Sequence, residues 1–301
     1  MQSINDVTIV GIVSENDLEK STFTKNGTQR NCIRGSIKVR VDQRLQSTDP
    51  EPTTLEIQVP FFTSELKNDG NPNPVYTSLK ETMEKIHSIA EVGIEKATWV
   101  RIPRARLEMN EYYKNDALVA FPRISASFIN IITPNAETKP EAKFTVSMYV
   151  QGGRDEVDKD GIETGRYIVK GVMLRYDGSA DVMEFIAAND KAVEFIKDNW
   201  TPGSTVDANG VLNFSAVTET REIEVAFGDP QYQTRTINVS ELILRSGSNP
   251  KEGDFAFAEE DIVAGAQKRN ERLAKLKAQS AAKTAATPTK GKGLDLSALG
   301  F

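Results

Sequence analysis

The sequence contains one cysteine and one histidine, and this scarcity excludes several kinds of site. Cys32 by itself cannot form an internal disulfide and fits a reducing compartment, so we expect a cytoplasmic protein. With His87 as the sole imidazole, neither a Cys/His zinc site nor a Ser-His-Asp triad can be assembled. No GxxxxGKS or GxxxxGKT phosphate loop occurs. We therefore expect a protein that is not an enzyme, with no catalytic residues, no metal and no cofactor.

Long apolar runs are also missing. No run approaches the roughly 18 residues of a membrane span. Residues 1–6 lack the basic and apolar regions of a signal peptide. We expect neither a membrane span nor a leader.

An acidic loop at residues 155–163, DEVDKDGIE, resembles a calcium loop only superficially. Counted from Asp155, glycine falls at the seventh position instead of the sixth, and no glutamate closes the loop at the twelfth. A solvated acidic loop is the better interpretation.

The net charge is −6, but the charge is unevenly distributed. Between Thr98 and Arg123 there are five basic residues and three acidic ones, whereas acidity concentrates elsewhere, including residues 252–261. Because the local field governs contact, an acidic protein can still carry a basic groove.

The first half of the chain is predicted to form three strands, a helix and two more strands. Alternating apolar residues predict strands over 5–15, 31–43 and 54–62, and two more over 98–133 joined by a turn at residues 114–116. Helical spacing predicts one helix over 77–92, and Gly11 indicates a bulge or bend. The polar segment 16–29 is predicted as a loop containing an Asn26-Gly27 turn. This is the element order of the OB-fold, a five-stranded Greek-key barrel with a helix between strands three and four.

The second half is predicted to repeat this order. Strands are expected over 144–150, 165–176 and 182–187, a helix over 189–199, and strands over 211–217, 222–227 and 234–244. We therefore predict a mostly β chain with two OB-fold-like barrels, at residues 1–134 and 141–249, separated by a linker at 134–141.

The stretch from Thr98 to Thr133 combines strand alternation with basic and aromatic residues. Arginine and lysine attract phosphates, and aromatic rings stack on unpaired bases, so this composition suits single-stranded nucleic acid. The alternative is a hairpin with a solvated charged face. The predicted nucleic-acid-binding residues of the first half are Arg34, Lys38, Arg40, Arg101, Arg104, Arg106, Tyr112, Tyr113, Lys114 and Arg123. Those of the second half are Tyr167, Lys170, Arg175 and Tyr176.

The C-terminal region differs in composition. Residues 255–282 are predicted as a helix that is acidic at its start and basic toward its end, which suits the helix dipole. Residues 283–301 are predicted as a flexible tail, because their composition cannot bury enough apolar surface to order itself. Two interpretations of the tip stay open: a frayed terminus, or a peptide that docks into a partner. The docking residues would be Leu294, Leu296, Leu299 and Phe301.

The element order of residues 5–246, the basic and aromatic strands and the apolar tip together resemble the single-stranded DNA-binding proteins of bacteriophages. This resemblance implies a protein that protects and organises single-stranded DNA during phage replication, recombination or repair in the host cytoplasm. It also implies that the tail recruits replication or recombination proteins. One departure is the tip, which carries Asp295 where the family's tips are strongly acidic.

A second hypothesis is a viral structural or assembly protein built of two β-barrels, with the basic residues pairing with neighbouring subunits. A ring or filament formed without nucleic acid, together with no oligonucleotide binding, would favour it. Self-association is compatible with both hypotheses. An enzyme is a distant third, because no catalytic constellation supports it.

Overall fold

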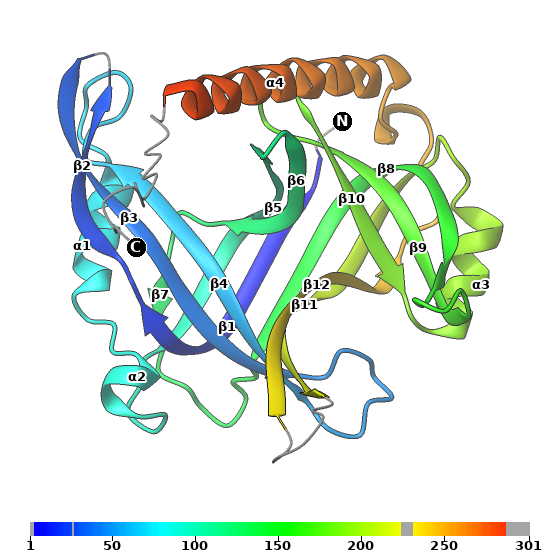
Figure 1. The fold of residues 1–301 in the computed structure, drawn as a ribbon, viewed down its shortest axis with the longest axis horizontal. Coiled ribbons are helices and arrows are strands. Elements are labelled where there is room, and N and C mark those ends of the chain that lie inside the picture. The colour runs from blue at the N-terminus through cyan, green and yellow to red at the C-terminus, as the bar shows by residue number, and fades with distance from the viewer. Residues whose placement is uncertain (1–2, 26, 224–230, 287–301) are drawn as a thin grey trace, which may run out of the picture.

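The computed structural model describes residues 3–25, 27–223 and 231–286, and these residues are mostly β (Figure 1). Twelve strands form one continuous sheet, and the described ranges contain four α-helices and one short 3-10 helix. The predicted mostly β chain with few helices and a C-terminal helix is confirmed. No helix in the described ranges is long and apolar enough to cross a membrane.

The first half is built on strands whose side chains alternate between the core and the solvent. In β4, Leu55, Ile57 and Val59 are fully buried, while Glu56 and Gln58 between them are exposed. The elements are β1 (Asn5–Asn16), β2 (Glu19–Lys25), β3 (Thr28–Gln43), β4 (Thr53–Ser64), α1 (Pro74–Met83), α2 (Ile89–Val92), β5 (Trp99–Lys114), β6 (Ala117–Ser125) and β7 (Asn130–Ile131). Strand β1 pairs with β3 and β5, β3 pairs with β4, and β5 pairs with β6.

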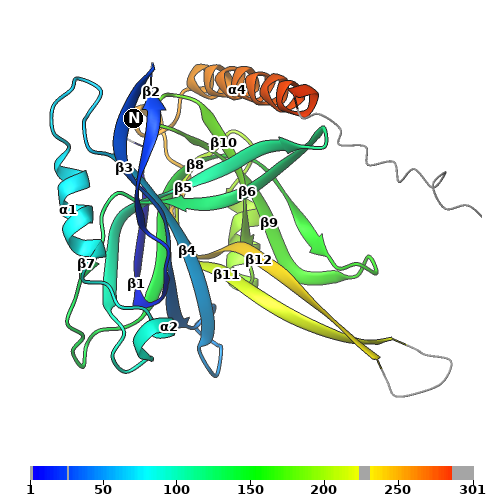
Figure 2. The same cartoon turned by 60° about the vertical axis from the view of Figure 1, so that its left-hand side comes forward.

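The second half closes into a ring of paired strands. Its elements are β8 (Glu141–Val157), β9 (Glu163–Leu174), β10 (Ala180–Ala187), α3 (Asp190–Asn199), β11 (Thr205–Ile223) and β12 (Gln231–Gly247), followed by η1 (Gly253–Phe255) and α4 (Glu259–Ala286). The pairing order is β8–β9–β10–β12–β11–β8, and the pair that links β10 to β12 is parallel. Figure 2 shows β11 and β12 projecting away from the body as a long hairpin.

Three predicted boundaries are wrong. The helix predicted over 77–92 is two helices, because Ser88 and Glu91 form a capping box that starts α2 anew. Residues 19–25, predicted as loop, form β2, which pairs along its length with β3. The strands predicted over 211–217 and 222–227 are one strand up to Ile223, because the polar residues between them continue the ladder with β12; residues 224–227 lie outside the described ranges.

The two halves are joined through β1 and β8. Residues Asn5–Val10 of β1 pair with residues 141–146 of β8, so the sheet runs from one half into the other. One core cluster contains Val7 and Ile9 from the first half together with Phe144 and Phe185 from the second. The predicted domain boundaries at 134 and 141 stay a prediction. Both the strand pairing between β1 and β8 and the hydrophobic core continue from one half into the other.

Gly11 lies where β1 changes partner, from β8 on one side of it to β3 on the other. A Cβ atom at this position would lie 2.3 Å from the Arg40 carbonyl oxygen and 2.9 Å from Val39 Cγ1. The bend predicted from this glycine thus corresponds to a close approach of two backbones that only glycine permits.

We expect Gly11→Ala to lower the free energy of unfolding by about 1–3 kcal/mol, because the added methyl group overpacks the strand junction. Urea denaturation followed by circular dichroism measures this change. Gly152→Ala is the matched control, because a Cβ atom at Gly152 meets nothing within 4 Å. Equal effects of the two substitutions would contradict the interpretation.

Candidate nucleic-acid interface

The hairpin of β5 and β6 is closed by a tight two-residue turn. Asn115 and Asp116 have φ angles of 51° and 60°, and Lys114 pairs with Ala117 across the turn. Asparagine and aspartate tolerate this left-handed conformation because their short polar side chains bond locally. The turn predicted at residues 114–116 is confirmed.

The hairpin has two chemically different faces. Ala105, Leu107 and Glu111 on β5 are buried, whereas Arg106 and Tyr112 on the alternate positions are exposed. We call the exposed side the outer face. It contains Arg101, Arg104, Arg106, Glu108, Asn110, Tyr112 and Lys114 from β5 and Val119, Phe121 and Arg123 from β6.

A β-bulge at Pro103 and Arg104 keeps three arginines on the outer face. Val7 pairs with Ala105 and Ile9 with Ile102, so β5 has one more residue than β1 in this interval. Arg104 has a φ of 54°, in the left-handed region that costs a non-glycine residue about 1–2 kcal/mol. Without the extra residue, simple alternation would not leave all three arginines exposed.

Most of the positive charge on the outer face is not neutralised by the protein. Arg123 pairs with Glu108 at 3.1 Å. In the described part of the chain, Arg101, Arg104, Arg106 and Lys114 form no salt bridge. Glu111, which lowers the net charge of this stretch in the sequence, lies on the opposite face. The outer face is therefore more basic than the sequence indicates.

Two aromatic rings share the outer face with these cations, and Lys114 and Arg123 are their nearest basic neighbours along the strands. Tyr112 and Phe121 pack edge to face with ring centroids 6.3 Å apart, and both are 40% exposed. Their exposed ring surfaces are of the kind on which unpaired bases stack. Phe121 is absent from the predicted site residues, although its position opposite Asn110 in an alternating strand places it on this face.

The predicted residues on β3 are exposed or half-exposed but already paired. Arg34 pairs with Glu19 at 2.8 Å, Lys38 with Glu15 at 2.6 Å and Arg40 with Asp42 at 3.3 Å. The hydrogen bond with Glu15 raises the pKa of Lys38 above its ordinary value. The expectation that these residues share one groove with the β5 arginines stays a prediction.

A second aromatic pair, with one half-buried and one exposed ring, lies near Arg34 and was not identified from the sequence. Phe23 on β2 and Phe62 on β4 pack edge to face with centroids 5.3 Å apart, and Phe62 is 61% exposed. Phe62 lies directly opposite Arg34 in the ladder. The signal was the Phe61-Phe62 doublet, because alternation in a strand places one of two neighbouring rings outside.

The four predicted residues of the second half have different surroundings. Tyr176 is 97% exposed, and Lys170 is also exposed. Tyr167 lies beneath the ammonium group of Lys197, 5.1 Å from its ring centroid. Arg175 forms a 2.7 Å ion pair with the buried Asp181, so its charge is engaged inside the protein.

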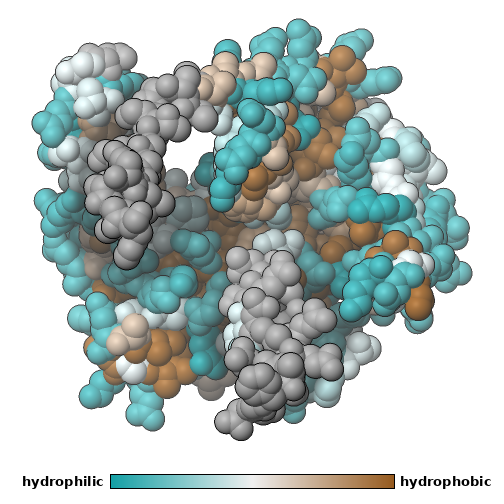
Figure 3. All heavy atoms as spheres, in the orientation of Figure 1, coloured by the Kyte–Doolittle hydropathy of each residue, from teal (hydrophilic) through white to brown (hydrophobic). Residues whose placement is uncertain are grey.

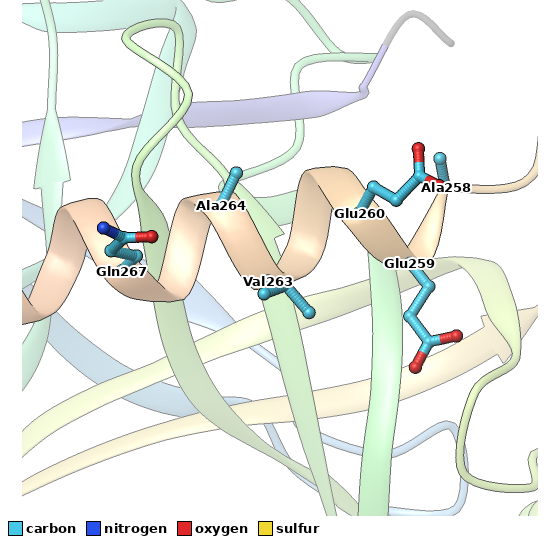
Figure 4. A pocket seen from close by; sticks show the side chains of 6 residues that line it. All are labelled: Ala258, Glu259, Glu260, Val263, Ala264 and Gln267. Atoms are coloured by element: carbon cyan, nitrogen blue, oxygen red, sulfur yellow. The ribbon is translucent and has the colours of Figure 1, made fainter.

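Two other features lie apart from the outer face. A shallow pocket follows the first turns of α4, and Figure 4 shows the side chains that line it: Ala258, Glu259, Glu260, Val263, Ala264 and Gln267. In Figure 3 a hydrophobic patch lies over α2, where Val92 and Ile94 are exposed.

Within the described ranges, no group of three or more His, Cys, Asp or Glu side chains is placed to hold a metal ion. The predicted docking residues Leu294, Leu296, Leu299 and Phe301 lie outside the described residues.

The substitution Arg104→Gly tests whether the backbone of the bulge is strained. We expect Arg104→Gly to leave the free energy of unfolding unchanged or to raise it by up to about 1 kcal/mol, because glycine adopts positive φ at little cost. Arg106→Gly, in ordinary extended strand, should lower it by about 0.5–1 kcal/mol. Chemical denaturation of both variants is the measurement. A larger loss for Arg104→Gly than for Arg106→Gly would show that Arg104 is not strained.

A model of the YorF family matches residues 3–279 of this chain. No curated protein matches this chain. Among solved structures, the chain is similar to the wild-type single-stranded DNA-binding protein from Thermus aquaticus, with 12% identity, a TM-score of 0.48 and coverage of 86% of this chain and 99% of that one. A deletion mutant of the same Thermus aquaticus protein matches with 11% identity, a TM-score of 0.48 and coverage of 86% and 98%.

Proposed function

The chain belongs to the YorF family, and we propose that it binds single-stranded DNA through the outer face of the β5–β6 hairpin. One observation carries this proposal: among the described residues, Arg101, Arg104 and Arg106 are exposed without a salt bridge, on the same outer face as the Tyr112–Phe121 pair. Arg104 maintains its exposed position at the cost of a left-handed backbone. Strain of this kind concentrates at functional sites.

The two kinds of side chain have separate roles. The arginines and Lys114 attract phosphates, and each phosphate neutralised releases counterions. Tyr112 and Phe121 offer ring surfaces to bases, with little dependence on sequence because every base has a stacking face. The net charge of −6 does not oppose this function, since the acidic residues lie largely elsewhere.

We further propose that each half is an OB-fold-like barrel. The ring β8–β9–β10–β12–β11 with α3 after its third strand supports this assignment for the second half. In the first half, β1, β3, β4, β5 and β6 follow the same order, with α1 after β4. The β5–β6 and β11–β12 hairpins then join strands four and five, a connection that OB-folds use for nucleic acid.

The biological setting is part of the same proposal. A protein of this kind would protect single-stranded DNA during replication, recombination or repair, in a bacteriophage and within the host cytoplasm. The apolar tip at residues 294–301 would bind a replication or recombination protein.

The first experiment is a fluorescence-anisotropy titration with a labelled oligo-dT of about 30 nucleotides, beside the matching duplex. We expect tight binding of the single strand, weak binding of the duplex, and a steep loss of affinity as salt rises. No binding of oligo-dT at low salt would overturn the proposal. A ring or filament seen without DNA in that case would favour an assembly protein.

Two substitutions should separate phosphate contact from stacking. Arg106→Ala should reduce the slope of log affinity against log salt by about 0.7, the value for one phosphate contact with a single strand. Tyr112→Ala should lower affinity about tenfold and leave that slope unchanged, because stacking releases no counterions. Lys85→Ala is the control, since Lys85 is exposed between α1 and α2, outside the outer face. A slope that falls equally in Lys85→Ala would place the phosphates elsewhere.

A further inference from the structure

A network of five charged side chains joins α4 to the hairpin and to the second half of the protein. Glu111 on β5 accepts hydrogen bonds from Arg269 Nε at 2.9 Å and from Arg272 Nη2 at 2.7 Å. Arg272 also reaches Asp181 on β10 at 3.4 Å, and Asp181 accepts from Arg175 Nε at 2.7 Å. In Figure 1, α4 passes above the hairpin and β10.

The network is buried where its negative charges lie. The side chains of Glu111 and Asp181 are 1% and 2% exposed, and three arginines surround them. Removing one arginine would leave a buried carboxylate without full compensation, which is strongly unfavourable. The network therefore specifies where α4 docks.

The hairpin requires support beyond its own ladder. The pairing between β1 and β5 ends at Ala105, and from Glu108 onward β6 is the strand that pairs with β5 in the described ranges. A two-stranded ribbon is marginally stable on its own. The second half holds this ribbon at Met109, whose N–H donates to Asp181 Oδ2 at 3.2 Å and whose carbonyl accepts from Arg175 Nη2 at 2.8 Å.

The helix α4 holds the ribbon nearer its tip, at Tyr113. The Lys277 ammonium group lies 6.0 Å from the centroid of the Tyr113 ring, and Ser280 Oγ donates to the Tyr113 carbonyl at 3.3 Å. Glu111 and Tyr113 thus contact α4, while the intervening Tyr112 is exposed on the outer face. Alternation along β5 places the support and the proposed binding surface on opposite sides of the same strand.

We propose that α4 acts as a brace for the DNA-binding hairpin, with Arg269 and Arg272 as positioning residues that contact Glu111 and not the DNA. This inference rests on the proposed function. The brace keeps the outer face ordered before DNA arrives, which reduces the conformational entropy lost on binding.

Hydrogen–deuterium exchange and the oligo-dT titration, applied to Arg269→Gln, test the brace. We expect faster exchange of the amides at residues 109–123, unchanged protection in β8–β10, and affinity lowered about fivefold. Arg269→Lys should recover part of the affinity because it restores the charge. Arg154→Gln, which breaks the exposed pair with Glu184, should change neither measurement.

A double-mutant cycle distinguishes positioning from a general loss of structure. If α4 acts through Tyr112, then Tyr112→Ala should cost less affinity in the Arg269→Gln background than in the wild type. If Arg269→Gln does not fold, Lys277→Ala replaces it, because it removes a contact with Tyr113 and leaves no buried carboxylate unpaired. We then expect the same changes in exchange, affinity and coupling to Tyr112→Ala, but smaller ones.

The outcomes separate the two proposals. Absence of oligo-dT binding by the wild-type protein overturns the proposed function. Wild-type binding, with exchange and affinity unchanged in Arg269→Gln, overturns the brace alone; where Arg269→Gln does not fold, the same result in Lys277→Ala overturns it. Additive effects of Arg269→Gln and Tyr112→Ala would also overturn it.

Discussion

The backbone hydrogen bonds of β1 are the constraint on which the rest of the structure depends. This strand pairs with β5 along its middle, with β8 on its first six residues and with β3 at four of its last five. It therefore places the hairpin, the wall of the first half and the first strand of the second half relative to one another. Gly11 makes the exchange of partners sterically possible, and Val7 and Ile9 anchor the junction in the core.

Electrostatics then distinguishes two kinds of basic residue. Arginines such as Arg34 and Arg175 are engaged with carboxylates, and the latter is part of a buried network that holds elements together. Arg104 and Arg106 on the outer face have no such partner among the described residues. An unpaired, exposed cation retains its full attraction for an external phosphate, whereas a paired one must first exchange its partner. The proposed DNA-binding surface is thus defined by which basic residues lack an ion pair within the described chain, more than by how many basic residues there are.

Much of the fold could be predicted from residue patterns. Alternation in β3 and β4 and the Asn115-Asp116 turn predicted strands and a hairpin close to those observed, because these signals are local. The same approach failed at β2, which is stabilised by its partner strand, and at Ser88, where a capping box interrupts an apolar helical pattern. It also assigned Arg175 to a binding surface. The pattern could not show that Arg175 is engaged inside the protein, because its ion pair with Asp181 joins the two ends of a hairpin and its bond to Met109 spans the two halves.

The sequence by itself determined the strand-rich class, most of the strands, the cluster of arginines and aromatic residues, and the absence of a Cys/His site. These depend on residue type and short spacing, which the chain carries whether folded or not. Tertiary structure decided which cations remain unpaired, that the bulge at Arg104 keeps three arginines on one face, and that Glu111 faces α4. Those outcomes depend on contacts between residues up to 161 positions apart, and such contacts exist only once β1 has brought the two halves together.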